Sequence, residues 1–128
     1  MKKTIKLEQA ARAYEALVAL SRESMAYRTA HAMMLLKKEL QKEAEFLQQE
    51  ELKIAKQHAV LDENGNIAWV DSGRFRLKTG EEAQYRKKIQ ELQNTEISVE
   101  AVKAEKPPET MTMEQAEALD GLLVFEEV

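Results

Sequence analysis

The chain has 128 residues, 44% of them hydrophobic and 33% charged, and it contains no cysteine. This length suits one domain with a modest core, and the lack of cysteine excludes a disulfide framework and a thiolate metal site. No apolar run approaches the roughly 20 residues that a membrane helix needs, and the basic start is not followed by an apolar signal core. We therefore expect an intracellular protein with no membrane contact.

Charge is distributed unevenly along the chain, whose formal net charge is −4. Residues 96–128 contain nine acids and two lysines, a net of −7, which leaves +3 on residues 1–95. A mildly basic body with an acidic tail is a weak indication of an anionic ligand, and a solvated surface is the simpler interpretation. A duplex nucleic acid partner would require more positive charge, so none is expected.

Apolar residues recur at three- and four-residue intervals in the first half of the chain, which predicts two helices. The first is expected over residues 7–22. After a turn in which Ser24 could cap the next helix, the second is expected over residues 25–57. A helix of that length spans about 45 Å. Its heptad-like apolar seam consists of Ala26, Ala30, Met33, Leu40, Ala44, Leu47 and Ile54.

The long helix is expected to extend beyond what one small domain can cover with its own residues. We therefore expect it to pack on the shorter helix, on a third helix or on another copy, and we expect a helix-mediated homo-oligomer. Leu36 and Phe46 lie off the seam and are expected to contact a second neighbour. Met25, Met33 and Met34 are most simply core residues, but methionines also form adaptable partner surfaces.

The hydrophobic period changes to strict alternation after the long helix, which predicts a hairpin and a third strand over residues 59–78. Asn64-Gly65 favours a type I′ turn, in which both central residues have positive φ. Thr79 to Glu82 matches a capping box, and a helix is expected over residues 80–94. The remaining expected elements are a strand over 96–100, a linker over 103–110, a second capping box at Thr112 to Gln115, a helix over 113–121 and a final strand or docking tail at 122–125.

These elements predict one α+β domain, with a long helix packed on a shorter one and a small antiparallel sheet. Asp62 to Asn66 superficially resembles the start of a calcium loop, but its glycine is fourth rather than sixth, and Gly73 stands where the bidentate Glu is required. His31 and His58 have no second ligand at a suitable spacing. With no catalytic motif present, we expect no enzyme activity, no metal and no cofactor.

The candidate binding residues are three cations that alternate along one strand, Arg74, Arg76 and Lys78, with Trp69 in the neighbouring strand. Arginine presents a planar fork that matches phosphate, and an indole face can stack on a base. In an oligomer, strand faces from several copies could line one pocket. The simpler interpretation is an exposed basic face, with Trp69 in a small core under the hairpin. Lower-ranked candidates are Tyr27, Arg28 and Tyr85.

The order of these elements resembles a family of small phage and prophage proteins of unknown function from viruses of Gram-positive bacteria. The residues that carry the resemblance are Asp62 to Asn66, Asn94 to Val99 and Met113 to Asp120, and it extends over most of the chain. It implies a phage context and a location in the host bacterial cytoplasm, but no active-site residues. The Arg-rich strand and Trp69 are not assigned to the family.

Phage context favours two functions. The first is an anti-defence protein that sequesters a host nucleotide-type immune signal, which is a small anionic ligand, without performing chemistry. The alternative is an assembly or structural accessory that binds another phage or host protein through its long helix or acidic tail.

Overall fold

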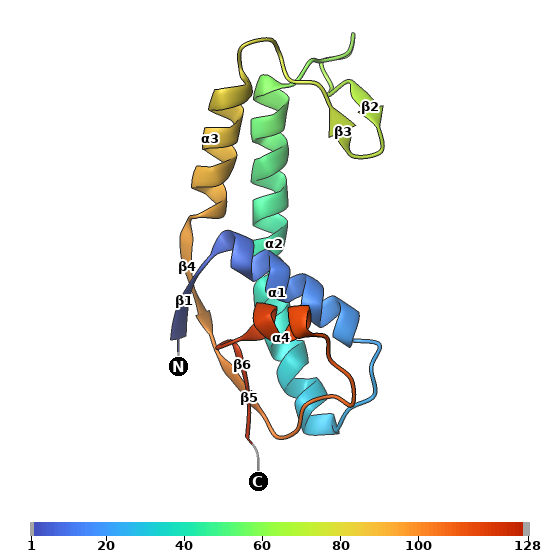
Figure 1. Cartoon of the computed structure of the whole chain (residues 1–128), viewed down its shortest axis with the longest axis vertical. Coiled ribbons are helices and arrows are strands. Elements are labelled where there is room, and N and C mark those ends of the chain that lie inside the picture. The colour runs from blue at the N-terminus through green and yellow to red at the C-terminus, as the bar shows by residue number, and fades with distance from the viewer. Residues whose placement is uncertain (1, 127–128) are drawn as a thin grey trace.

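A computed structural model describes residues 2–126, which form a mixed α+β fold (Figure 1) and confirm the expected class. The elements, in chain order, are β1 Lys2–Lys6, α1 Leu7–Leu20, α2 Tyr27–His58, β2 Trp69–Asp71, β3 Arg74–Phe75, α3 Glu82–Gln93, β4 Glu96–Glu100, β5 Val102–Ala104, α4 Met113–Leu119 and β6 Leu123–Phe125. The helices begin or end within two residues of their expected bounds.

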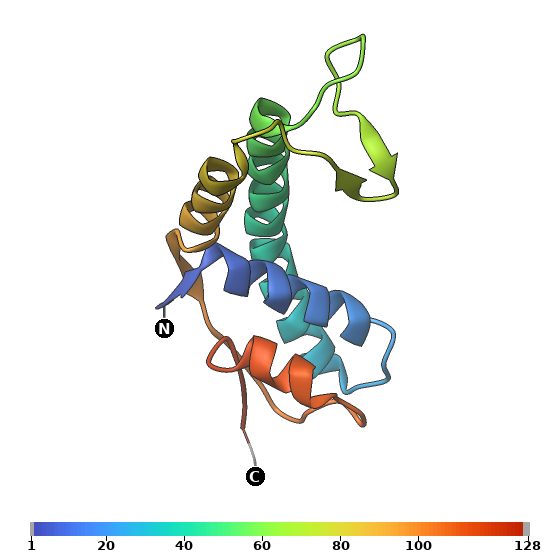
Figure 2. The same ribbon diagram turned by 45° about the horizontal axis from the view of Figure 1, so that its top comes forward.

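The main core lies where α1, α4 and the β4–β5 segment meet the first half of α2 (Figures 1 and 2). Alanines of α1 at positions 10, 13 and 16 share this core with Leu36 and Leu40 of α2. Because alanine side chains are small, the backbone of α1 can approach α2 closely. The larger Leu36 and Leu40 fill the space that remains between the two helices. Leu36, which was expected to lie off the apolar seam, is completely buried.

The strands form three two-stranded ladders within residues 2–126, two of them antiparallel as expected and one parallel. β1 pairs antiparallel with β4, and β2 pairs antiparallel with β3. β5 pairs parallel with β6, with Val102 opposite Leu123. Parallel strands need a crossover connection, and α4 lies within it. The segment 103–110 was expected to be a linker, but its first two residues belong to β5 because β6 provides a partner.

The turn at Asn64-Gly65 differs from the expected type I′ turn because Asn64 does not have a positive φ, whereas Gly65 has a φ of 79°. Instead, the Asp62 carboxylate accepts hydrogen bonds from the backbone N–H groups of Asn64 (2.9 Å) and Asn66 (3.0 Å). Such an Asx turn stabilises the loop without a left-handed Asn. Leu61 pairs antiparallel with Ile67 across this turn, as the predicted hairpin requires, and a second hairpin, formed by β2 and β3, turns at residues 72–73.

The two predicted capping boxes have opposite outcomes. At α4, Thr112 Oγ1 accepts from the Gln115 N–H (3.1 Å) and Gln115 Oε1 accepts from the Thr112 N–H (2.9 Å), as expected. At α3, Glu81 rather than Thr79 stands at the N-cap, and no side chain caps the helix. Gly80 has a φ of 83°, so the backbone turns between Thr79 and the helix instead of placing Thr79 at its start.

The start of α2 also departs from the expectation that Ser24 caps it at residue 25. Ala26 occupies the N-cap, and the helix begins at Tyr27. Because alanine has no side-chain acceptor, the first turn of α2 lacks a side-chain cap.

Candidate functional site

Residues 59–78 form a small irregular sheet at the C-terminal end of α2, away from the main core (Figures 1 and 2). Val60 lies between the segment that contains Ala68 and the segment that contains Arg76. Its N–H donates to the carbonyl of Arg76 (2.8 Å), and its carbonyl accepts from the N–H of Ala68 (3.0 Å). Beyond Ala68 and before Arg76, these two segments pair directly with each other as β2 and β3, with Trp69 opposite Phe75.

The inner face of this sheet is apolar and packs on α2 and α3. Ala59 and Ile67 are buried with Ala55 of α2, and Phe75 and Tyr85 pack against them. Trp69 continues the row, with its ring centroid 5.5 Å from that of Phe75 in an edge-to-face arrangement. Trp69 stands at the solvent-facing end of this group of apolar side chains and is 51% exposed.

The outer face is basic. Arg74, Arg76 and Lys78 are exposed, and they alternate with the half-buried Phe75 and Leu77. The guanidinium of Arg74 is held by Asp71, with Nη2 3.0 Å from a carboxylate oxygen. Within residues 2–126, the side chains of Arg76 and Lys78 have no ion pair or hydrogen bond. These two cations are therefore the ones available to an anionic ligand.

The hairpin separates the aromatic and the cationic candidates. Residues directly opposite each other in an antiparallel pair share a face, whereas successive residues face opposite sides. Trp69 therefore lies on the Phe75 face, and Arg74 and Arg76 lie on the other. One hairpin cannot stack a base flat on Trp69 and hold its phosphate with both arginines, so a combined site needs hairpins of two copies.

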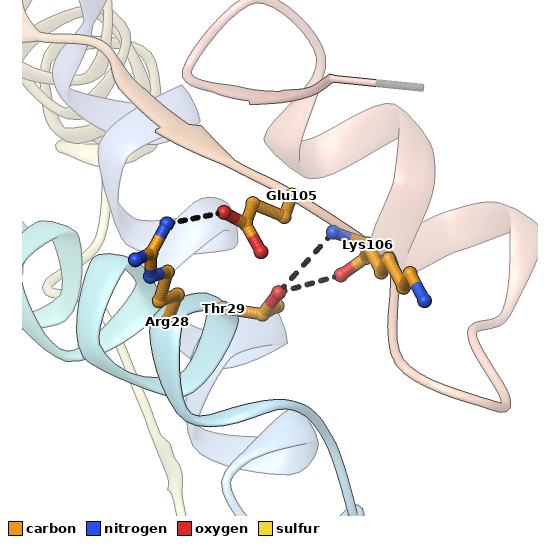
Figure 3. Close-up of polar contacts among 4 residues, drawn as sticks. All are labelled: Arg28, Thr29, Glu105 and Lys106. Atoms are coloured by element: carbon orange, nitrogen blue, oxygen red, sulfur yellow. Dashed lines mark hydrogen bonds and ion pairs between the residues drawn. The ribbon is translucent and has the colours of Figure 1, made fainter. Parts of the chain in front are cut away.

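Tyr27 and Arg28 lie at the opposite end of α2, and at about 1.5 Å per residue they are more than about 40 Å along the helix from the hairpin. The Arg28 guanidinium donates to Glu105 (2.6 Å), as Figure 3 shows. Tyr27 is exposed and stacks on His31. Of the seven candidates, the structure groups five around the hairpin and leaves these two elsewhere.

The junction between α2 and α3 contains a polar pair that the sequence did not single out. His58 is 4% exposed, and its Nδ1 lies 3.1 Å from Glu81 Oε1. Its Nε2 has no hydrogen-bond partner among the described residues. The backbone carbonyl of His58 also accepts from the Lys78 N–H (2.8 Å). His58 therefore ties the end of the hairpin to the start of α3.

Two groups near this junction have shifted pKa values. Partial burial, and to a lesser extent the charge of Glu8, raises the pKa of Glu51. Partial burial, followed by the charge of Glu51, raises the pKa of Tyr85. Glu51 thus lies between an acidic group of α1 and an aromatic group of α3.

Comparison with protein-family models, with curated proteins and with solved structures finds no match for this chain. Within residues 2–126, no helix has the length and apolarity needed to cross a membrane. The same residues contain no group of three or more His, Cys, Asp or Glu side chains that could hold a metal ion. The relationship to phage proteins stays a prediction from the sequence.

Proposed function

We propose that this chain is a phage-encoded binding protein that performs no chemistry and sequesters a nucleotide-type immune signal of the host bacterium. The observation that carries the proposal is the outer face of the hairpin, where three cations are exposed at alternate positions along β3 and the residues that follow it. Two of them, Arg76 and Lys78, are not engaged by an acid within the described residues. Charge-assisted hydrogen bonds from such groups are the usual way to hold phosphate.

The aromatic half of the site comes from a second copy in this proposal. Trp69 is half exposed and cannot face the cations of its own hairpin, but it can face those of another copy. Base stacking on an aromatic ring contributes about 1–3 kcal/mol. A nucleotide between two hairpins would then contact the basic face of one and the indole of the other.

Oligomerisation is consistent with the apolar side chains that remain on the surface of α2. Phe46 and Leu52 are 48% and 53% exposed, on parts of α2 that α1 and α3 leave uncovered. The seam residues Met33, Leu40 and Leu47 are already buried within one chain. We therefore propose that a homo-oligomer uses the exposed residues rather than the predicted seam.

Calorimetric titration with cyclic and ADP-ribose-type nucleotides tests this function. The wild-type protein is expected to release heat with at least one of them, and Arg76→Ala is expected to weaken binding at least tenfold. Arg22→Ala removes a charge from the α1–α2 loop, remote from the hairpin, and serves as the matched control. Absence of heat with every nucleotide, or equal binding by both variants, would contradict the proposal.

A second candidate function is that of an assembly accessory, and the exposed Phe46 and Leu52 of the long helix favour it. An amphipathic partner could cover these side chains in place of another copy. Purification from infected cells separates the two functions. A stoichiometric phage protein would favour the accessory, whereas a bound small molecule would favour sequestration.

A further inference from the structure

A half-open cavity of about 220 Å³ lies between the C-terminal end of α1 and the first turns of α2. This is the end of α2 opposite the hairpin (Figure 1), so the cavity is independent of the proposed nucleotide site. The residues that line it are mostly apolar, with three methionines among them: Leu17, Ser21, Glu23, Met25, Ala30, Met33, Met34 and Lys37.

The size and lining of the cavity indicate what it can accept. Pockets for drug-sized ligands have volumes of about 300–1,000 Å³, so this one is too small for a nucleotide. It matches one large apolar side chain instead. Methionine is flexible and polarisable, which lets a methionine-lined pocket adapt to leucine or to an aromatic ring. Protein interfaces are commonly anchored by such a side chain in a pocket.

The charge at the rim is unbalanced. The carboxylate of Glu23 is engaged, because it accepts a hydrogen bond from the Thr110 hydroxyl (3.0 Å). Lys37 is half-buried and has no ion-pair partner within residues 2–126. Lys38 beside it is exposed and also unpaired in that range. An occupant that brings a carboxylate next to its apolar anchor would therefore gain a charge-assisted contact.

The surface beside the cavity has the shape of a helix-binding strip. Tyr27, His31, Met34 and Lys38 follow one another at intervals of four, three and four residues, so they lie on one face of α2. Tyr27 is 80% exposed and stacks on His31, with 6.1 Å between ring centroids. A row of side chains at this spacing fits an amphipathic helix, because the contact residues of such a helix recur at the same intervals.

We propose that this face of the molecule docks an acidic amphipathic helix of another protein. One large apolar side chain of that helix enters the methionine-lined cavity, and a neighbouring Glu or Asp pairs with Lys37. The Tyr27 strip contacts the rest of the helix. The site gives Tyr27 a role that is separate from nucleotide binding.

A charge-reversal experiment tests the docking surface. Two sets of short synthetic helices would carry a Leu, Phe or Trp anchor and would differ only in having Glu or Lys beside it. Fluorescence anisotropy is expected to show binding of the acidic set by the wild-type protein. Lys37→Glu is expected to reverse the preference by at least tenfold, whereas Lys56→Glu, near the other end of α2, leaves it unchanged. Equal binding of both sets, or no binding of either, would overturn the proposal.

A second variant tests the cavity without disturbing the core. Ala30 lines the cavity but is itself exposed, so Ala30→Trp is expected to fill the cavity and to leave the fold intact by circular dichroism. Loss of acidic-helix binding in this variant supports the proposal, and retained binding contradicts it. If Lys37→Glu instead changes the mass of the protein in light scattering, the occupant is a second copy, and the proposal of a foreign helix is wrong.

Discussion

His58 is the residue on which the position of the hairpin depends. It is buried at the point where α2, the hairpin and α3 meet, and one ring nitrogen is paired with Glu81 while the other has no partner in the described part of the chain. A buried polar group that loses its hydrogen bond costs more than the bond contributed. The contact between His58 and Glu81 is therefore one of those that fix the orientation of the basic strand, together with the backbone hydrogen bond from the Lys78 N–H to the His58 carbonyl.

Removing the partner of His58 is expected to destabilise the protein. Glu81→Ala leaves both ring nitrogens without a protein partner, and the free energy of unfolding should fall by about 1–3 kcal/mol. Urea denaturation measures this change. Glu63→Ala removes an exposed acid of the turn and should change stability by less than about 0.5 kcal/mol. Equal stability of the two variants would show that the His58–Glu81 contact is not formed in solution.

Glu51 is expected to give a pH-dependent stability with a defined sign. Because its pKa in the folded protein is raised, the native state binds this proton more tightly than the unfolded chain. This residue therefore contributes stability at low pH that is lost as the pH rises through the raised pKa. Glu51→Gln should raise the melting temperature at pH 7, but only by about 1–2 °C, because solvent still screens this half-buried group.

Melting curves of both proteins at several pH values test the sign of this effect. The two proteins should converge below the ordinary carboxyl pKa, where Glu51 is neutral in both states. A destabilised Glu51→Gln at pH 7 would show that the carboxylate has a favourable partner.

At the scale of elements, the segment that follows β5 is fixed to α2 by Thr29. Thr29 is fully buried, and its hydroxyl donates to the carbonyl of Lys106 (2.7 Å) and accepts from the Lys106 N–H (3.4 Å), as Figure 3 shows. Arg28 and Glu105 form an exposed ion pair beside it. The two contacts have similar geometry but very different exposure to water.

Thr29→Val and Arg28→Ala separate the buried contact from the exposed one. The valine keeps the shape of the side chain but leaves two backbone groups of Lys106 unpaired, which should cost about 1–3 kcal/mol. Loss of the exposed ion pair should cost less than about 1 kcal/mol. Chemical denaturation compares them, and a larger loss for Arg28→Ala would contradict this ranking.

The helices could be predicted from the sequence because each depends on a local period. The capping box of Thr112 was also correct, since it needs only residues within one turn. The box at Thr79 failed because the backbone turns at Gly80 and Glu81 pairs with His58, 23 residues earlier in the chain. The parallel pairing of β5 and β6 was missed because the two strands are far apart in the sequence, and no local pattern identifies their partners.

The candidate site could be predicted only in part. The alternation of Arg74, Arg76 and Lys78 with apolar residues indicated an exposed basic face, and their exposure follows that pattern. The position of Trp69 on the opposite face follows from the register with Phe75, which shifts between Trp69 and Asp71. Such an irregularity has no clear sequence signal. The separation of Tyr27 and Arg28 from the hairpin followed from their place at the start of a long helix.

At the scale of the whole molecule, α2 separates two surfaces of different chemistry. The hairpin lies at one end of α2 (Figure 1) and presents cations and an indole, whereas the methionine-lined cavity is formed by residues at the other end. About 30 Å of helix lies between Lys37 of the cavity and the end of α2 at the hairpin, which exceeds the Debye length of about 8 Å at physiological salt. The charges at one end should therefore have little effect on binding at the other.

The proposed oligomer predicts a response to charges on the exposed surface of α2. Light scattering at micromolar concentration should give a mass above that of the 14.7 kDa chain. Phe46→Glu or Leu52→Glu should lower this mass because each places a carboxylate in an apolar contact. Arg22→Glu reverses an exposed charge in the α1–α2 loop, away from Phe46 and Leu52, and is the control. A wild-type protein that is only monomeric would contradict the oligomer.

The crystal structure of the native assembly tests the central proposal most directly. If the protein sequesters a nucleotide between copies, the Arg76 and Lys78 face of one hairpin and Trp69 of another should line the same cavity. If the basic faces instead point to solvent on separate parts of the surface, with no Trp69 opposite them, the proposed two-copy site is wrong.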